Sequence, residues 1–105
     1  MTIEEIVAEI KAIKADYAGD VTSPQMGLIQ HLTRDALFDC HWDDNPIVET
    51  IWGDCRVSEL SKADASRFID HFGRKTEDGW EVQHIEQMAA LWHEFMKRQG
   101  QQELF

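Results

Sequence analysis

The chain has 105 residues, which predicts one domain and excludes a two-domain enzyme. With 43% hydrophobic residues and only two prolines it can form a small core, so global disorder is disfavoured. Ten Lys and Arg against 20 Asp and Glu give a formal net charge of −10, which disfavours direct binding to nucleic acid or to anionic membranes.

Residues 1–18 predict the first helix. Its apolar residues recur at spacings of three and four and therefore share one helix face: Ile3, Ile6, Val7, Ile10, Ile13 and Tyr17. Thr2 and Glu5 have the spacing of a capping box at its start. Gly19 and Asp20 predict its end.

Two Pro-containing starts predict the next helices. A Ser-Pro pair, with Ser as N-cap and Pro in the first turn, predicts a helix over residues 23–38. Asn45 and Pro46 likewise predict a short helix that runs to Trp52 and ends at Gly53.

A further helix is predicted by the clearest start pattern in the sequence. Ser61, with Asp64 three residues later, is typical of an N-cap, and Leu60 occupies the place of a hydrophobic staple. The apolar pattern ends at Phe72, and Gly73 predicts a left-handed C-terminal cap.

Residues 74–79 predict a polar linker before a final helix over residues 80–100, which Gly100 ends. One stripe of this helix carries its apolar residues: Val82, Ile85, Ala89, Trp92, Phe95 and Met96. No alternation of period two extends over a useful length. We therefore predict an all-α fold, a single small bundle of four to five helices in residues 1–100, followed by a short flexible C-terminal tail of residues 101–105.

Two segments resemble a known family. They are Ser23-Pro24-Gln25-Met26-Gly27-Leu28-Ile29 and, in residues 57–70, Val-Ser-Glu-Leu-Ser-Lys-Ala-Asp-Ala-Ser-Arg-Phe-Ile-Asp. Their arrangement resembles the GemA-like family of phage and prophage regulatory proteins, and related helical modules of phage recombination proteins. The resemblance implies an early phage or mobile-element protein that acts in DNA metabolism. It implies no reaction.

The C-terminal tail has a motif of its own. Gln101, Leu104 and Phe105 fit the pattern Gln-x-x-Leu-Phe, which resembles the peptide by which bacterial polymerases and repair proteins bind the sliding clamp. Leu and Phe entering an apolar pocket can offset the entropy that an ordered tail loses. The alternatives are that Leu104 and Phe105 pack back over the helices, or that the match is fortuitous.

Carboxylates concentrate in residues 35–64 and predict an acidic face: Asp35, Asp39, Asp43, Asp44, Glu49, Asp54, Glu59 and Asp64. Such a face can mimic phosphates and inhibit a DNA-binding protein, or it can be a solvated surface that maintains solubility. A third hypothesis, a weak nucleic-acid-binding module, would use the few bases: Arg67, Arg74, Lys75, Lys97 and Arg98.

Metal-binding and catalytic patterns are absent from the sequence. Cys40 and His41, with Cys55 and His71 as further ligands, match no zinc spacing, and residues 43–45 lack the rest of a calcium loop. No nucleophile elbow, phosphate-binding glycine loop or metalloprotease helix occurs. We predict no metal, no cofactor and no catalytic residues.

Neither a signal peptide nor a stretch of about 20 apolar residues occurs, which predicts a soluble, cytoplasmic protein. The leading prediction is a non-enzymatic accessory protein of phage type. Its partner would be a component of the replication or recombination machinery, with the sliding clamp as the first candidate. Amphipathic stripes on the terminal helices leave homodimerisation open.

Overall fold

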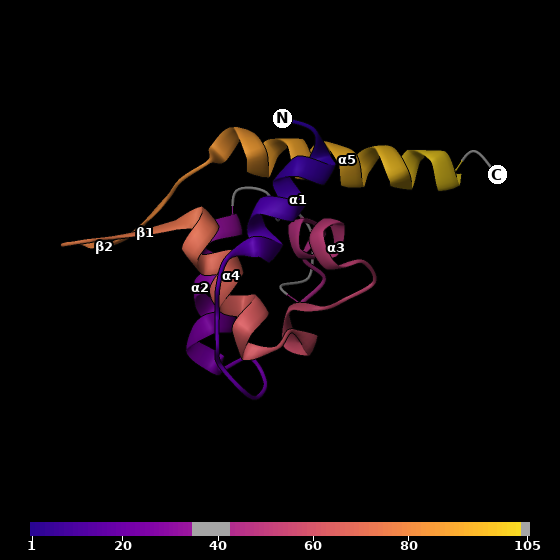
Figure 1. The fold of residues 1–105 in the computed structure, drawn as a ribbon. Coiled ribbons are helices and arrows are strands. Elements are labelled where there is room, and N and C mark those ends of the chain that lie inside the picture. Colours follow the sequence, from indigo (N-terminus) through magenta and orange to yellow (C-terminus); the bar gives the residue numbers. More distant parts are fainter. Residues whose placement is uncertain (35–42, 104–105) are drawn as a thin grey trace.

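The computed structural model describes residues 1–34 and 43–103, the last three by their backbone alone. In this part of the chain, five α-helices surround a small core and a two-stranded hairpin extends from one side (Figure 1). In chain order the elements are α1 (Ile3–Ala12), α2 (Ser23–Thr33), α3 (Pro46–Trp52), the 3-10 turn η2 (Val57–Glu59), α4 (Lys62–Phe72), β1 (Gly73–Thr76), β2 (Gly79–Val82) and α5 (Ile85–Glu103).

The start of α1 confirms the predicted capping box. The Glu5 amide donates to Thr2 Oγ1 and the Thr2 amide donates to Glu5 Oε1, both at 3.1 Å. The helix nevertheless ends at Ala12, six residues before the predicted end. The chain beyond it runs alongside the start of α4, where the Val21 amide donates to the Leu60 carbonyl and the Lys62 amide to that of Gly19. These contacts between distant segments replace further helical turns.

The predicted starts of α2, α3 and α4 are close to those observed. Thr22, one residue before the predicted Ser, caps α2 through a reciprocal pair of hydrogen bonds with Gln25. Asn45 caps α3 and Ser61 caps α4, as predicted. The predicted end of the second helix, residues 35–38, lies outside the described residues.

Gly73 does not form the predicted left-handed cap, since its φ is −114°. The chain instead passes straight from α4 into β1. A Cβ at this position would lie 2.9 Å from the Ile69 carbonyl oxygen and 3.0 Å from side-chain atoms of both Leu32 and Trp80. Glycine is therefore required here for close approach, not for a positive φ.

The hairpin corrects the prediction of an all-α fold. β1 and β2 pair antiparallel, from Gly73 opposite Val82 to Thr76 opposite Gly79, where a linker and the start of the last helix were predicted. Trp80 packs against the core from β2. The described fold is therefore mostly helical with one small sheet.

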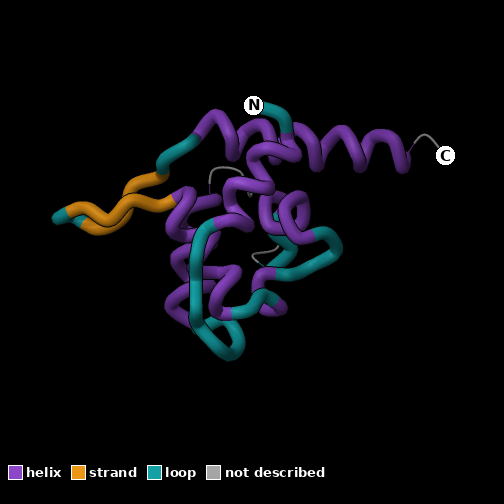
Figure 2. The backbone as a smooth tube through the Cα atoms, in the orientation of Figure 1, coloured by secondary structure: helices purple, strands orange, loops and turns teal. Residues whose placement is uncertain are grey.

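Two features of α5 also differ from the prediction. The helix continues through Gly100 to Glu103, so Gly100 does not end it. Met88 and Leu91 are its buried residues, whereas Ile85 and Met96 of the predicted core stripe are 64% and 47% exposed. The helix lies across α3 and α1, and its last turns extend past the rest of the molecule (Figures 1 and 2).

Candidate partner-binding surfaces

The clamp-like motif lies at the end of α5. Gln101 belongs to the last turn of α5, which runs to Glu103, whereas a tail was predicted from residue 101. Leu104 and Phe105 lie outside the described residues.

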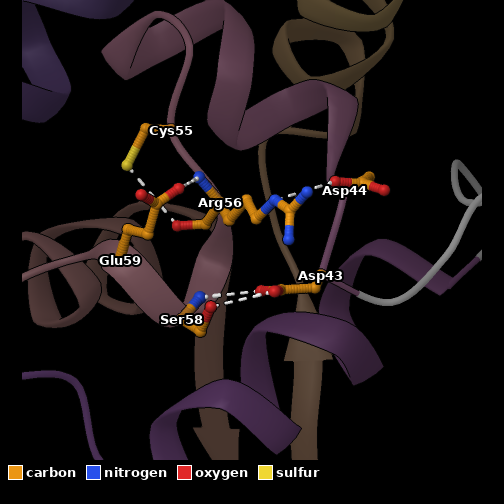
Figure 3. Close-up of polar contacts among 6 residues, drawn as sticks. All are labelled: Asp43, Asp44, Cys55, Arg56, Ser58 and Glu59. Carbon is orange, nitrogen blue, oxygen red and sulfur yellow. Dashed lines mark hydrogen bonds and ion pairs between the residues drawn. The ribbon is translucent and has the colours of Figure 1, made fainter.

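Part of the predicted acidic face comes together in the structure. Between α3 and η2, carboxylates surround Cys55 and Arg56 (Figure 3). They line a polar hollow of about 470 Å³, to which Asp44, Glu49, Asp54 and Glu59 contribute. Asp35 and Asp39 lie outside the described residues.

Asp43 and Asp44 make internal contacts in this acidic cluster. Asp43 is 9% exposed, and its two carboxylate oxygens accept hydrogen bonds from the amide and the hydroxyl of Ser58, both at 2.9 Å (Figure 3). Asp44 forms a 3.5 Å ion pair with Arg56. Asp43 thus joins the start of α3 to η2, which is a structural role.

Burial and mutual repulsion perturb the remaining groups of the cluster. Partial burial, followed by the charges of Asp54 and Asp44, raises the pKa of Glu49 above its ordinary value. Partial burial, followed by Glu59 and other carboxylates, raises the pKa of the Cys55 thiol. A thiol held in its protonated form is a poor nucleophile and a poor metal ligand.

The predicted acidic residue Asp64 and most of the predicted bases are in ion pairs. Asp64 pairs with Arg67 at 2.6 Å on α4, away from the hollow. Arg74 pairs with Glu81 at 2.6 Å across the hairpin, and Arg98 pairs with Glu94 at 3.2 Å on α5. The other two bases, on β1 and α5, are Lys75 and Lys97. The described bases therefore do not form one continuous basic face.

Within residues 1–34 and 43–103, no group of three or more His, Cys, Asp or Glu side chains is placed to share a metal ion. Cys40 and His41 lie outside this part of the chain. His71 is buried, contacts Gln87 Oε1 through Nε2 at 2.6 Å and stacks on His84 with ring centroids 4.7 Å apart. These contacts indicate a structural role for His71.

An apolar groove was missed by sequence reasoning. It has a volume of about 770 Å³ and is enclosed by the end of α2, by β2 and by the first half of α5. Its apolar lining comes from Leu32, Trp80, Val82, Ile85, Met88 and Trp92. The prediction of a helix over residues 80–100 puts Trp80 and Trp92 on one helix, whereas Trp80 lies on β2 and Trp92 on α5.

Comparison with known proteins returned no match: no family model, no curated protein and no solved structure is similar to this chain. The GemA-like resemblance and the clamp-like motif therefore rest on the residues quoted above. None of the described helices combines the length and apolar character needed to cross a membrane.

Proposed function

We propose that the protein is a non-enzymatic accessory protein of phage or prophage type that binds a component of the DNA replication machinery. The partner is the bacterial sliding clamp, and the contact is made by Gln101, Leu104 and Phe105. The observation that supports this function best is the position of the motif: it follows helical turns that have already left the body of the molecule (Figure 1).

Binding in an extended form requires the last turn of α5 to open. Gly100 lies just before the motif, and glycine weakens a helix by about 1 kcal/mol relative to alanine. The residues after it belong to a helix end, which opens more easily than a helix interior. Burial of a Leu and a Phe contributes about 1.5 to 3 kcal/mol each. This burial opposes the cost of opening one turn and of ordering the bound segment.

Isothermal titration with purified sliding clamp tests this function. Gln101→Ala, Leu104→Ala and Phe105→Ala should each weaken binding, by about tenfold or more for the two apolar residues. Gln102→Ala is the matched control, because it changes the neighbouring glutamine at a position that the motif leaves unspecified. Binding that is equally tight for wild type and Leu104→Ala would refute the proposal.

The acidic cluster supports a second candidate function, inhibition of a DNA-binding protein by phosphate mimicry. What favours it is the convergence of Glu49, Asp54 and Glu59 on one hollow. Binding of this kind weakens steeply with salt and depends on these carboxylates, whereas clamp binding through apolar side chains is nearly indifferent to salt. Wild type, Glu49→Gln and Leu104→Ala are each titrated with the partner protein at low and at high salt, and the comparison separates the two functions.

A further inference from the structure

The outer face of α5 is apolar along most of its length. Ile85, Ala89, Trp92 and Met96 are spaced by four, three and four residues, so at 3.6 residues per turn they lie within about 60° of one another. Ile85 is 64% and Met96 47% exposed, Ala89 is exposed and Trp92 is half-buried. This spacing is that of a helix–helix seam. We call these four residues the α5 seam.

The α5 seam is complementary to itself when two copies of the helix run antiparallel. If Trp92 lies beside the two-fold axis, Ala89 of one copy faces Met96 of the second copy, and Ile85 faces Gly100. Met96 and Ile85 then each meet a small residue, which is the arrangement that lets two helices interdigitate, and the two Trp92 side chains lie next to each other at the axis. Gly100 has no heavy atom within 4 Å of its Cβ position, so this part of the helix is open.

Charge also favours α5 as the face where two acidic chains meet. Residues 85–103 contain three acids and two bases, a net charge of −1 out of −10 for the whole chain. Glu86 lies in the first turn, whereas Lys97 and Arg98 lie near the other end. Antiparallel pairing places Glu86 of one copy and Lys97 of the second on the same side of the seam, and it also opposes the two helix dipoles.

The apolar groove continues the α5 seam at its N-terminal end, since Ile85, Ala89 and Trp92 belong to both. In the antiparallel arrangement the C-terminal end of the second copy's α5 enters this groove.

We infer that the α5 seam and the adjoining groove form a homodimer interface, in which a second copy of this chain packs its α5 antiparallel against the first. The interface is isologous, because each copy supplies the same seam and the same groove. It does not depend on clamp binding.

Sedimentation velocity over a range of protein concentrations tests the dimer. Wild type should reach twice the chain mass of 12.2 kDa. Ile85→Glu and Met96→Glu should each raise the dimer dissociation constant at least about tenfold, because they place charge in an apolar seam. The control is Tyr17→Glu, which changes an apolar side chain of similar exposure, 57%, outside α5. Circular dichroism checks that each variant is folded.

A disulfide trap tests the orientation in a background in which Cys40 and Cys55 are serine. Ala89→Cys with Met96→Cys should give a covalent dimer under mild oxidation. Within one chain these two positions are about 10 Å apart along the helix, too far for a disulfide. Either cysteine alone should give little covalent dimer. Strong cross-linking of the Ala89→Cys single variant would mean parallel helices and would overturn the arrangement.

Two other results would overturn the inference. One is a wild-type chain that stays monomeric at submillimolar concentration. The other is a dimer that Ile85→Glu and Met96→Glu leave unchanged. The clamp titration is a separate measurement at low protein concentration, so a failed dimer and a failed clamp interaction are distinguishable.

Discussion

Asn45 allows a quantitative test of how the helices are joined. It is 1% exposed, and its side-chain oxygen accepts hydrogen bonds from the amides of Ile47 at 3.0 Å and Val48 at 3.2 Å. Its Nδ2 donates to Thr33 Oγ1 at 2.9 Å, which links α3 to α2. Asn45→Ala removes the cap and leaves its two buried amides without an acceptor, about 1 to 3 kcal/mol, and it removes the hydrogen bond to Thr33, about 1 kcal/mol more. We expect a total loss of about 2 to 4 kcal/mol in the free energy of unfolding, measured by urea denaturation.

Two further variants separate the contributions. Ser61→Ala removes an exposed cap, whose oxygen accepts from the Asp64 amide at 3.0 Å, and should cost only about 1 kcal/mol. Asn45→Asp keeps the acceptor for α3 but replaces the donor to Thr33 with a buried carboxylate oxygen, so it should be nearly as destabilising as Asn45→Ala. The reasoning is refuted if Asn45→Ala costs no more than Ser61→Ala.

Three other predictions concern glycines and one carboxylate. Gly73→Ala should destabilise the fold by about 1 to 3 kcal/mol through overpacking, whereas Gly27→Ala, in open space within α2, should stabilise it by about 0.5 to 1 kcal/mol; thermal melts compare the two. The raised pKa of Glu49 means that the folded state binds the proton of this carboxyl more tightly than the unfolded state does. Ionised Glu49 therefore destabilises the fold, and this effect sets in as pH rises above the ordinary pKa of 4.5. Glu49→Gln should therefore be more stable than wild type at pH 7 and equal to it below pH 4.5, in denaturation curves taken across pH. Gly100→Ala should strengthen the end of α5 and weaken clamp binding up to about fivefold, and unchanged affinity would mean that the motif binds without opening the helix.

Helix starts could be predicted from the sequence because their hydrogen bonds join residues two or three positions apart. The Thr2 and Glu5 box, the Asn45 cap and the Ser61 cap all depend on this local geometry. The early end of α1 could not be predicted, because it depends on backbone pairing between residues 19–21 and 60–62.

The hairpin and the orientation of α5 were missed for a related reason. Val82 precedes Ile85 at a spacing of three that also suits a helix, and four-residue strands are too short for a period of two to emerge. α5 is apolar on two faces. Periodicity alone could not decide whether the face with Leu91 or the face with Met96 meets the core.

The candidate surfaces also differ in how far the sequence could predict them. The acidic cluster was predictable in part, because its described carboxylates lie within 17 consecutive residues, 43–59. The hydrogen bonds between Asp43 and Ser58 could not be predicted, because they require the chain between these two residues to fold back on itself. The apolar groove was not predictable either, because it combines three elements separated by up to 61 positions, from His31 to Trp92.

The two proposals assign the end of α5 to different partners. The clamp contact needs residues 101–105 opened and free, whereas the dimer holds the same helix end against the groove of the second copy. Binding of one partner therefore lowers the affinity for the other by mass action. Met96→Glu, which weakens only the dimer, should then tighten the clamp interaction measured at high protein concentration and leave it unchanged at low concentration. Equal effects at both concentrations would show that the two contacts do not compete.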